Sequence, residues 1–128
     1  MKDPIGIILD KAREKLEAAE ILLKEEKFED SVSRSYYAIL YAARALLVKD
    51  KIYPKSHAGT ITIFSQKYIK TKKVSRKFIS IFAETERARE IADYGLEVEF
   101  SREFTQNKLN QSKEFVQRIE DLLKDKYT

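Results

Sequence analysis

Apolar residues recur every three or four positions through most of this chain, which is the spacing of one face of an α-helix. Between Ile8 and Leu23 the series continues through Ala12, Leu16 and Ala19. The 128 residues include only three glycines and two prolines, so few segments suit the tight turns of a β-sheet. The pattern therefore predicts long helices. The expected helices cover residues 4–26, 29–49, 57–69, 75–94 and 102–126.

Residues that favour helix ends stand at the boundaries of these segments. Asp3 is suited to cap the first helix, and Pro4 is suited to its first position. Ser56 is a suitable cap for the third helix, and we expect Gly95 to end the fourth in the left-handed region. Short connections between long helices predict an all-α fold, an antiparallel up-and-down four-helix bundle with a shorter fifth helix. The length fits a single domain over residues 1–128.

The composition excludes several classes of site. There is no cysteine and only one histidine, so disulfides, thiolate metal sites and histidine-rich metal centres are not expected. We predict no metal and no cofactor. The sequence has no long uncharged apolar run and no signal-peptide pattern, so we expect a cytoplasmic protein without a membrane partner.

The segment 29–49 is apolar or aromatic on almost every side. Its only charges between Val32 and Val48 are Arg34 and Arg44. A helix of this kind must be buried on more than one side, and a second subunit is one way to cover it. We therefore predict a homodimer. Arg34 and Arg44 share one side of this helix with Tyr37 and Tyr41, a mixture that suits base stacking and phosphate binding and is also typical of protein interfaces.

A charged cluster interrupts the apolar stripe of the segment 75–94. Arg89 stands at a core-type position, with Glu86 one helical turn before it and Asp93 one turn after it. The planar guanidinium suits a carboxylate or a phosphate, so the cluster could form a phosphate-binding cleft together with Arg87 and Tyr94. The alternative is a set of ion pairs within the helix, each contributing about 0.2–0.5 kcal/mol.

Two further features could bear on function. A run of basic residues without an intervening acid could attract RNA or an acidic partner, or could be a solvated loop. The run consists of Lys67, Lys70, Lys72, Lys73, Arg76 and Lys77. The single histidine, His57, directly follows Ser56. It could transfer a proton, or it could be an ordinary residue at the start of a helix.

Taken together, several segments of this chain resemble the HEPN superfamily. They are SRSYYA at 33–38, AARALL at 42–47, Ser56-His57 and REIADY at 89–94. The branch that they resemble most consists of small archaeal and bacterial single-domain proteins. The resemblance implies an up-and-down helical bundle, commonly dimeric, often encoded beside a minimal nucleotidyltransferase in a toxin–antitoxin-like pair.

The resemblance also implies an activity, because many HEPN proteins are metal-independent endoribonucleases. Their signature is an arginine, four to six intervening residues and a histidine. Here the window that follows Arg89 falls on Tyr94, Gly95 and Leu96, and the window that follows Arg87 ends at Tyr94, so neither contains a histidine. Arg89 can inherit the role of facing the phosphate, whereas proton transfer has no matching residue. In some relatives a tyrosine near the motif is modified by the partner, and Tyr94 is the nearest equivalent.

We therefore predict a HEPN-like module that binds a nucleotide, an RNA or a partner protein and works with a minimal nucleotidyltransferase. The expected ligand-binding residues are Arg34, Tyr37, Arg87, Arg89, Asp93 and Tyr94. One alternative is an endoribonuclease in which Arg89 acts with Tyr94 or His57. Another is a structural dimerisation protein with no ligand.

Overall fold

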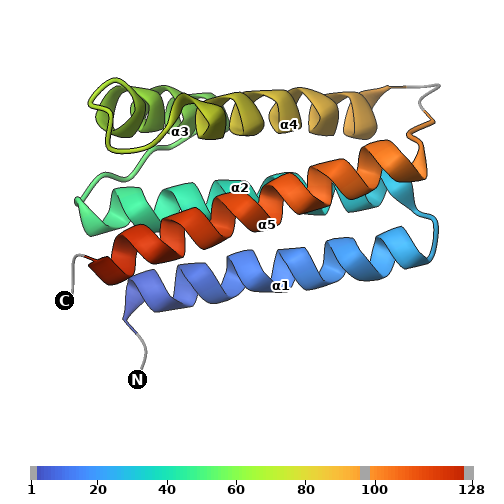
Figure 1. Cartoon of the computed structure of the whole chain (residues 1–128), viewed down its shortest axis with the longest axis horizontal. Helices are drawn as coiled ribbons and strands as arrows, with labels where there is room; N and C mark the ends of the chain where they lie inside the picture. Colours follow the sequence, from blue (N-terminus) through green and yellow to red (C-terminus); the bar gives the residue numbers. More distant parts are fainter. Residues whose placement is uncertain (1–2, 96–98, 126–128) are drawn as a thin grey trace.

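The computed structural model describes residues 3–95 and 99–125, which fold into a bundle of helices without a β-strand in those ranges. The elements are α1 (Pro4–Lys24), α2 (Phe28–Lys49), α3 (His57–Phe64), the π-helix η1 (Ser65–Ile69), α4 (Arg76–Tyr94) and α5 (Arg102–Asp125). The chain reverses direction from α1 to α2 and again from α4 to α5 (Figure 1). The predicted all-α fold is confirmed. Within the described ranges, every helix is too short or too polar to cross a membrane.

Side-chain caps define where most of the helices begin. The Asp3 carboxylate accepts a hydrogen bond of 2.8 Å from the Gly6 backbone N–H, and the Ser56 hydroxyl oxygen accepts one of 2.9 Å from Gly59. Gly95 directly follows the last residue of α4, as expected, but the predicted left-handed conformation was wrong, because its φ of −78° and ψ of 132° are those of extended backbone. Its N–H donates to the Ile91 carbonyl at 2.7 Å, so α4 ends by straightening and needs no left-handed residue.

The predicted single helix over 57–69 is divided into α3 and η1. At the end of η1 the Lys70 N–H donates to the Ser65 carbonyl, five residues back, at 2.9 Å. The neighbouring residues Tyr68 and Ile69 are both buried, which the wider turn of a π-helix permits. The Tyr68 hydroxyl lies 2.5 Å from the Asp50 carboxylate and thereby joins η1 to the end of α2.

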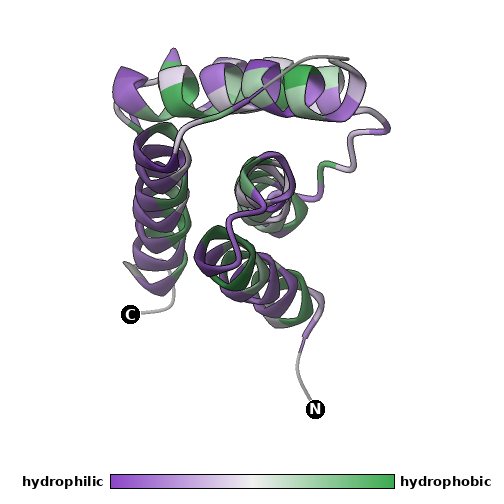
Figure 2. Cartoon of the chain, turned by 90° about the vertical axis from the view of Figure 1, so that its right-hand side faces the viewer, coloured by the Kyte–Doolittle hydropathy of each residue, from purple (hydrophilic) through white to green (hydrophobic). Residues whose placement is uncertain are grey.

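Helix α2 is the centre of the bundle. It packs against α1, α3, α4 and α5, and Figure 2 shows it nearly end-on, with other helices above it, below it and on its left. Our reason for predicting a second subunit was therefore wrong, because helices of the same chain already cover α2 on several sides. The homodimer itself stays a prediction.

An aromatic cluster sets the position of α4 over the rest of the bundle. Phe64, Phe82 and Phe115 come from α3, α4 and α5, and their ring centroids are 5.5–5.9 Å apart. Phe82 also packs against Tyr36 of α2, with the ring centroids 6.3 Å apart. Burying one such side chain contributes about 1.5–3 kcal/mol. The cluster lies less than two turns before Arg89, so it holds the second half of α4 beside α2.

Candidate functional site

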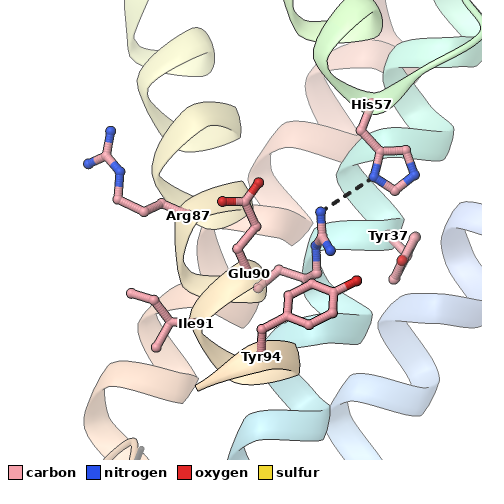
Figure 3. A pocket seen from close by; sticks show the side chains of 7 residues that line it. Tyr37, His57, Arg87, Glu90, Ile91 and Tyr94 are labelled. Atoms are coloured by element: carbon pink, nitrogen blue, oxygen red, sulfur yellow. Dashed lines mark hydrogen bonds between the residues drawn. The ribbon is translucent and has the colours of Figure 1, made fainter. Parts of the chain in front are cut away.

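A pocket of about 660 Å³ opens beside the second half of α4. Helix α2 and the first residue of α3 form the facing side (Figure 3). Its lining residues are Tyr37, His57, Arg87, Arg89, Glu90, Ile91 and Tyr94. Four of the six residues that we expected to bind a ligand therefore share one pocket.

Arg89 is held in place by contacts on several sides of its guanidinium. The residue is 7% exposed, and its guanidinium carbon lies 4.9 Å from the centre of the Tyr36 ring. One terminal nitrogen lies 3.4 Å from the Asp93 carboxylate, and the other lies 4.0 Å from Glu86. These distances exceed the 2.7–2.9 Å typical of a strong charge-assisted hydrogen bond. The two acids therefore orient Arg89 without saturating its donors.

The electrostatic surroundings keep Arg89 positively charged and favour the neutral form of Glu86, one of its two acidic neighbours. Burial by itself lowers the pKa of Arg89, but the hydrogen bond to Asp93 and the nearby tyrosines outweigh it, so that this pKa is raised. Burial, followed by the charge of Glu90, raises the pKa of Glu86. Within the described residues, the Nε of Arg89 is buried and has no hydrogen-bond partner. The donors that an anion in the pocket could meet are the two terminal nitrogens, whose pairs with Asp93 and Glu86 are long.

His57 reaches this pocket from the start of α3. Its Nδ1 lies 3.5 Å from a terminal nitrogen of Arg89, as the dashed line in Figure 3 shows. Its ring packs edge-on against Tyr37, with the centroids 5.8 Å apart. Burial, followed by the charges of Arg89 and Arg44, lowers the pKa of His57. The imidazole is therefore neutral near pH 7 and able to accept a proton.

Nothing in the order of residues places His57 beside Arg89, because 32 positions separate them in the chain. The only available signal was Ser56, which starts α3 and so puts His57 on its first turn. The packing of α3 and α4 against α2 then brings the histidine to the arginine.

The outer part of the pocket is formed by exposed side chains. Tyr94 is 77% exposed, and Figure 3 shows its ring beside the pocket with the hydroxyl on the side of Tyr37. Arg87 is exposed and forms no ion pair with any residue in the described ranges. Glu90, also exposed, adds one negative charge to the lining. Two tyrosines and a second arginine thus flank the buried guanidinium.

Other predicted site residues lie elsewhere. Arg34 is exposed on α2 outside the pocket, and Asp93 contacts Arg89 without lining the pocket. Tyr41 and Arg44 line a separate hollow of about 520 Å³ together with Tyr53. The arginine–tyrosine side of α2 is therefore divided between two hollows. No group of three or more His, Cys, Asp or Glu side chains in the described part of the chain is arranged to hold a metal.

Comparison with known proteins agrees with this architecture. The family model for the HEPN domain matches residues 6–122. This chain belongs to the HEPN family. A UPF0332 protein of Thermotoga maritima is 33% identical to this HEPN protein over 115 residues, covering 90% of this chain and 87% of the relative.

Two relatives from Methanocaldococcus jannaschii are each named "Putative toxin". One is 31% identical over 116 residues and covers 91% of this HEPN chain and 79% of its own length. The other is 30% identical over 125 residues and covers 98% and 92%, respectively. This chain thus matches most of the length of each of these relatives.

Proposed function

We propose that this HEPN protein is a toxin-like module that binds the phosphate group of a nucleotide or an RNA in the pocket of Arg89. The observation that carries the proposal is a buried guanidinium at the pocket wall whose pairs with Asp93 and Glu86 are long. Phosphate presents oxygens that match the planar fork of arginine. A partly desolvated site makes that attraction stronger than it would be in water.

The residues around Arg89 suit the other parts of a nucleotide. Tyr37 and Tyr94 offer aromatic surfaces on which a base can stack, a contact that contributes about 1–3 kcal/mol. Arg87 adds a second cation at the outer edge. Glu90 opposes binding, because its carboxylate shares the lining with the expected phosphate position. We therefore expect the two arginines to strengthen the binding of a phosphate group and Glu90 to weaken it.

The binding test compares two Arg→Met substitutions. Arg89→Met removes the buried cation, whereas Arg34→Met removes an exposed one on α2 outside the pocket. Titration with ATP and with a short RNA, followed by calorimetry, should show at least about a tenfold loss for Arg89→Met, since hydrogen bonds to charged groups contribute about 1.5–3 kcal/mol. The Arg34→Met control should stay within about twofold. If wild-type protein binds neither ligand, the proposal is wrong.

A second candidate function is metal-independent RNA cleavage, which the contact between His57 and Arg89 favours. In this reaction His57 would accept the proton of a ribose 2′-hydroxyl, and the 2′-oxygen would form a bond to the adjacent phosphorus while the bond to the 5′-oxygen breaks. The leaving 5′-oxygen would take up a proton from water, which gives a cyclic phosphate and a free 5′-hydroxyl. Arg89 would stabilise the charge that develops on the phosphate. The distance of 3.5 Å lets both groups reach one phosphodiester, and the lowered pKa keeps His57 unprotonated.

Cleavage of labelled RNA in the presence of EDTA tests this candidate. His57→Gln should abolish cleavage, whereas Tyr94→Phe should retain it. The opposite result would transfer the proton-accepting role to Tyr94. Intact RNA with the wild-type protein would leave the protein a binding module only.

We also propose a homodimer and a minimal nucleotidyltransferase as a partner, as the resemblance implies for a toxin–antitoxin-like pair. The names of the two archaeal relatives support the toxin-like part. For the dimer, the hollow that contains Tyr41 is bordered by Ile7 and Tyr53, which are 49% and 68% exposed. Sedimentation at micromolar concentration should show a dimer that Tyr41→Glu dissociates. Co-purification with a nucleotidyltransferase encoded beside this protein would test the partner.

A further inference from the structure

The charges of this protein are strongly segregated along the chain. The 33 residues from Lys51 to Ala83 contain eight lysines and arginines and neither aspartate nor glutamate. The chain as a whole has 25 basic and 21 acidic residues, so the remainder has 17 basic and 21 acidic ones and a net charge of −4. The net positive charge of the protein therefore comes from this one segment.

The fold gathers the basic segment into one layer of the molecule. It forms α3, η1 and the first half of α4, which lie together along the upper side of the bundle in Figure 1. The six cations near the η1–α4 connection are all exposed. They are Lys67, Lys70, Lys72, Lys73, Arg76 and Lys77. Lys77 pairs with Glu114, whereas the other five have no acidic partner within the described ranges. We call these five side chains the basic layer.

One face of α4 connects the basic layer with the Arg89 pocket. Arg76 and Arg87 are 11 residues apart, which is close to three helical turns, so both lie on the same face. Between them this face carries Ser80 and Ala83, both small and uncharged. Arg87 lines the pocket. This face of α4 therefore has one arginine near the η1–α4 connection and one at the pocket, with two small uncharged residues between them.

We propose that the basic layer binds a single strand of nucleic acid that continues into the Arg89 pocket, so that the ligand spans several nucleotides. At 1.5 Å per residue, Arg76 and Arg87 are separated by about 16 Å along the helix axis. With about 3.4 Å per phosphate in a stacked strand, about five nucleotides cover this distance. The end of the strand in the pocket rests on the proposed function, whereas the basic layer has support of its own from charge and exposure.

The inference is tested by measuring how affinity depends on strand length and salt. Fluorescence anisotropy compares labelled ribo-oligomers of two and eight uridines, and an eight-residue deoxythymidine strand distinguishes DNA from RNA. We expect the octamer to bind the wild-type protein at least about tenfold tighter than the dimer. With about five phosphate contacts, the octamer should lose about 100-fold in affinity between 50 and 200 mM salt.

A matched pair of charge reversals locates the surface. Lys73→Glu with Arg76→Glu changes two exposed residues of the basic layer, and Lys24→Glu with Lys27→Glu makes the same change at the α1–α2 junction. The first variant should weaken octamer binding by about 20-fold at 0.1 M salt, because it loses two phosphate contacts. Each contact contributes about 0.7 to the slope of log affinity against log salt concentration. The control should lose less than about threefold.

The outcomes separate this inference from the proposed function. Equal affinity for dimer and octamer, or equal losses in the two charge-reversal variants, would overturn the inference. Tighter binding of polyglutamate than of the octamer would also overturn it and would assign the surface to an acidic protein. If Arg89→Met leaves dimer and octamer binding unchanged while the Lys73/Arg76 variant loses the octamer, the pocket proposal fails and the basic layer stands.

Discussion

Replacing Arg89 by methionine should remove ligand binding and leave the fold intact. The substitution takes a cation out of a site where the residue is 7% exposed and keeps a flexible apolar side chain against the Tyr36 ring. It also leaves Asp93 and Glu86 without their cation. Removing one partner of a fully buried ion pair costs about 3–5 kcal/mol, because the other charge is left unpaired. Here the side chains of Asp93 and Glu86 are 31% and 17% exposed, so water can solvate the two acids and we expect a much smaller cost.

The expected change in the free energy of unfolding follows mainly from the ion pair between Arg89 and Asp93. At 3.4 Å and an effective dielectric constant of about 20, the gross attraction between Arg89 and Asp93 is about 5 kcal/mol. The Asp93 side chain is 31% exposed, so water screens the pair, and pairs of this kind contribute about 1 kcal/mol or less in measured cycles. The desolvation cost of Arg89, which the variant no longer has, offsets the lost contribution of this ion pair. We expect the free energy of unfolding to change by less than about 1 kcal/mol in either direction, whereas ligand affinity falls about 10- to 150-fold.

Urea unfolding at pH 7 and pH 5, together with the calorimetric titration, tests this reasoning. Burial and Glu90 raise the pKa of Glu86, and the charge of Arg89 opposes that rise, so the substitution should raise this pKa further. An acid whose pKa is higher in the folded state costs stability as pH increases through that pKa. The variant should therefore gain stability relative to wild type when the pH falls to 5. If the free energy of unfolding fell by more than about 3 kcal/mol at both pH values, or if ligand affinity were unchanged, the role given to Arg89 would be wrong.

Three further outcomes are expected. Tyr68→Phe should reduce the free energy of unfolding by about 1–2 kcal/mol, since the Tyr68 hydroxyl lies 2.5 Å from the Asp50 carboxylate. Tyr36→Phe should not reduce it, because the Tyr36 hydroxyl is buried and unpartnered within the described residues. Urea unfolding of the two variants compares these effects. The lowered pKa of His57 means that the unfolded chain binds its proton first, so the stability of the wild type should fall as pH decreases below about 6.5, and His57→Gln should flatten that part of the pH profile of unfolding. Glu90→Gln should strengthen ATP binding about three- to tenfold by calorimetry, and weaker binding would show that this carboxylate contacts the ligand favourably.

The fold was predictable because helix formation depends on neighbours a few positions apart. The spacing of apolar residues marked the helices, and the caps at Asp3 and Ser56 lie where the sequence placed them. The π-helical turn at Ser65–Ile69 was not predictable, because it depends on tertiary packing. Its wider turn lets the neighbouring residues Tyr68 and Ile69 both be buried.

The sequence by itself determined the helical class, the burial of Arg89 in the stripe of its helix and the segregation of basic charge into one segment, because each depends on the order of residues alone. The tertiary structure decided which of these features meet. It placed His57 beside Arg89, divided the arginine–tyrosine side of α2 between two hollows and covered α2 with helices of its own chain. These outcomes depend on how separate helices pack, and local periodicity does not specify that packing.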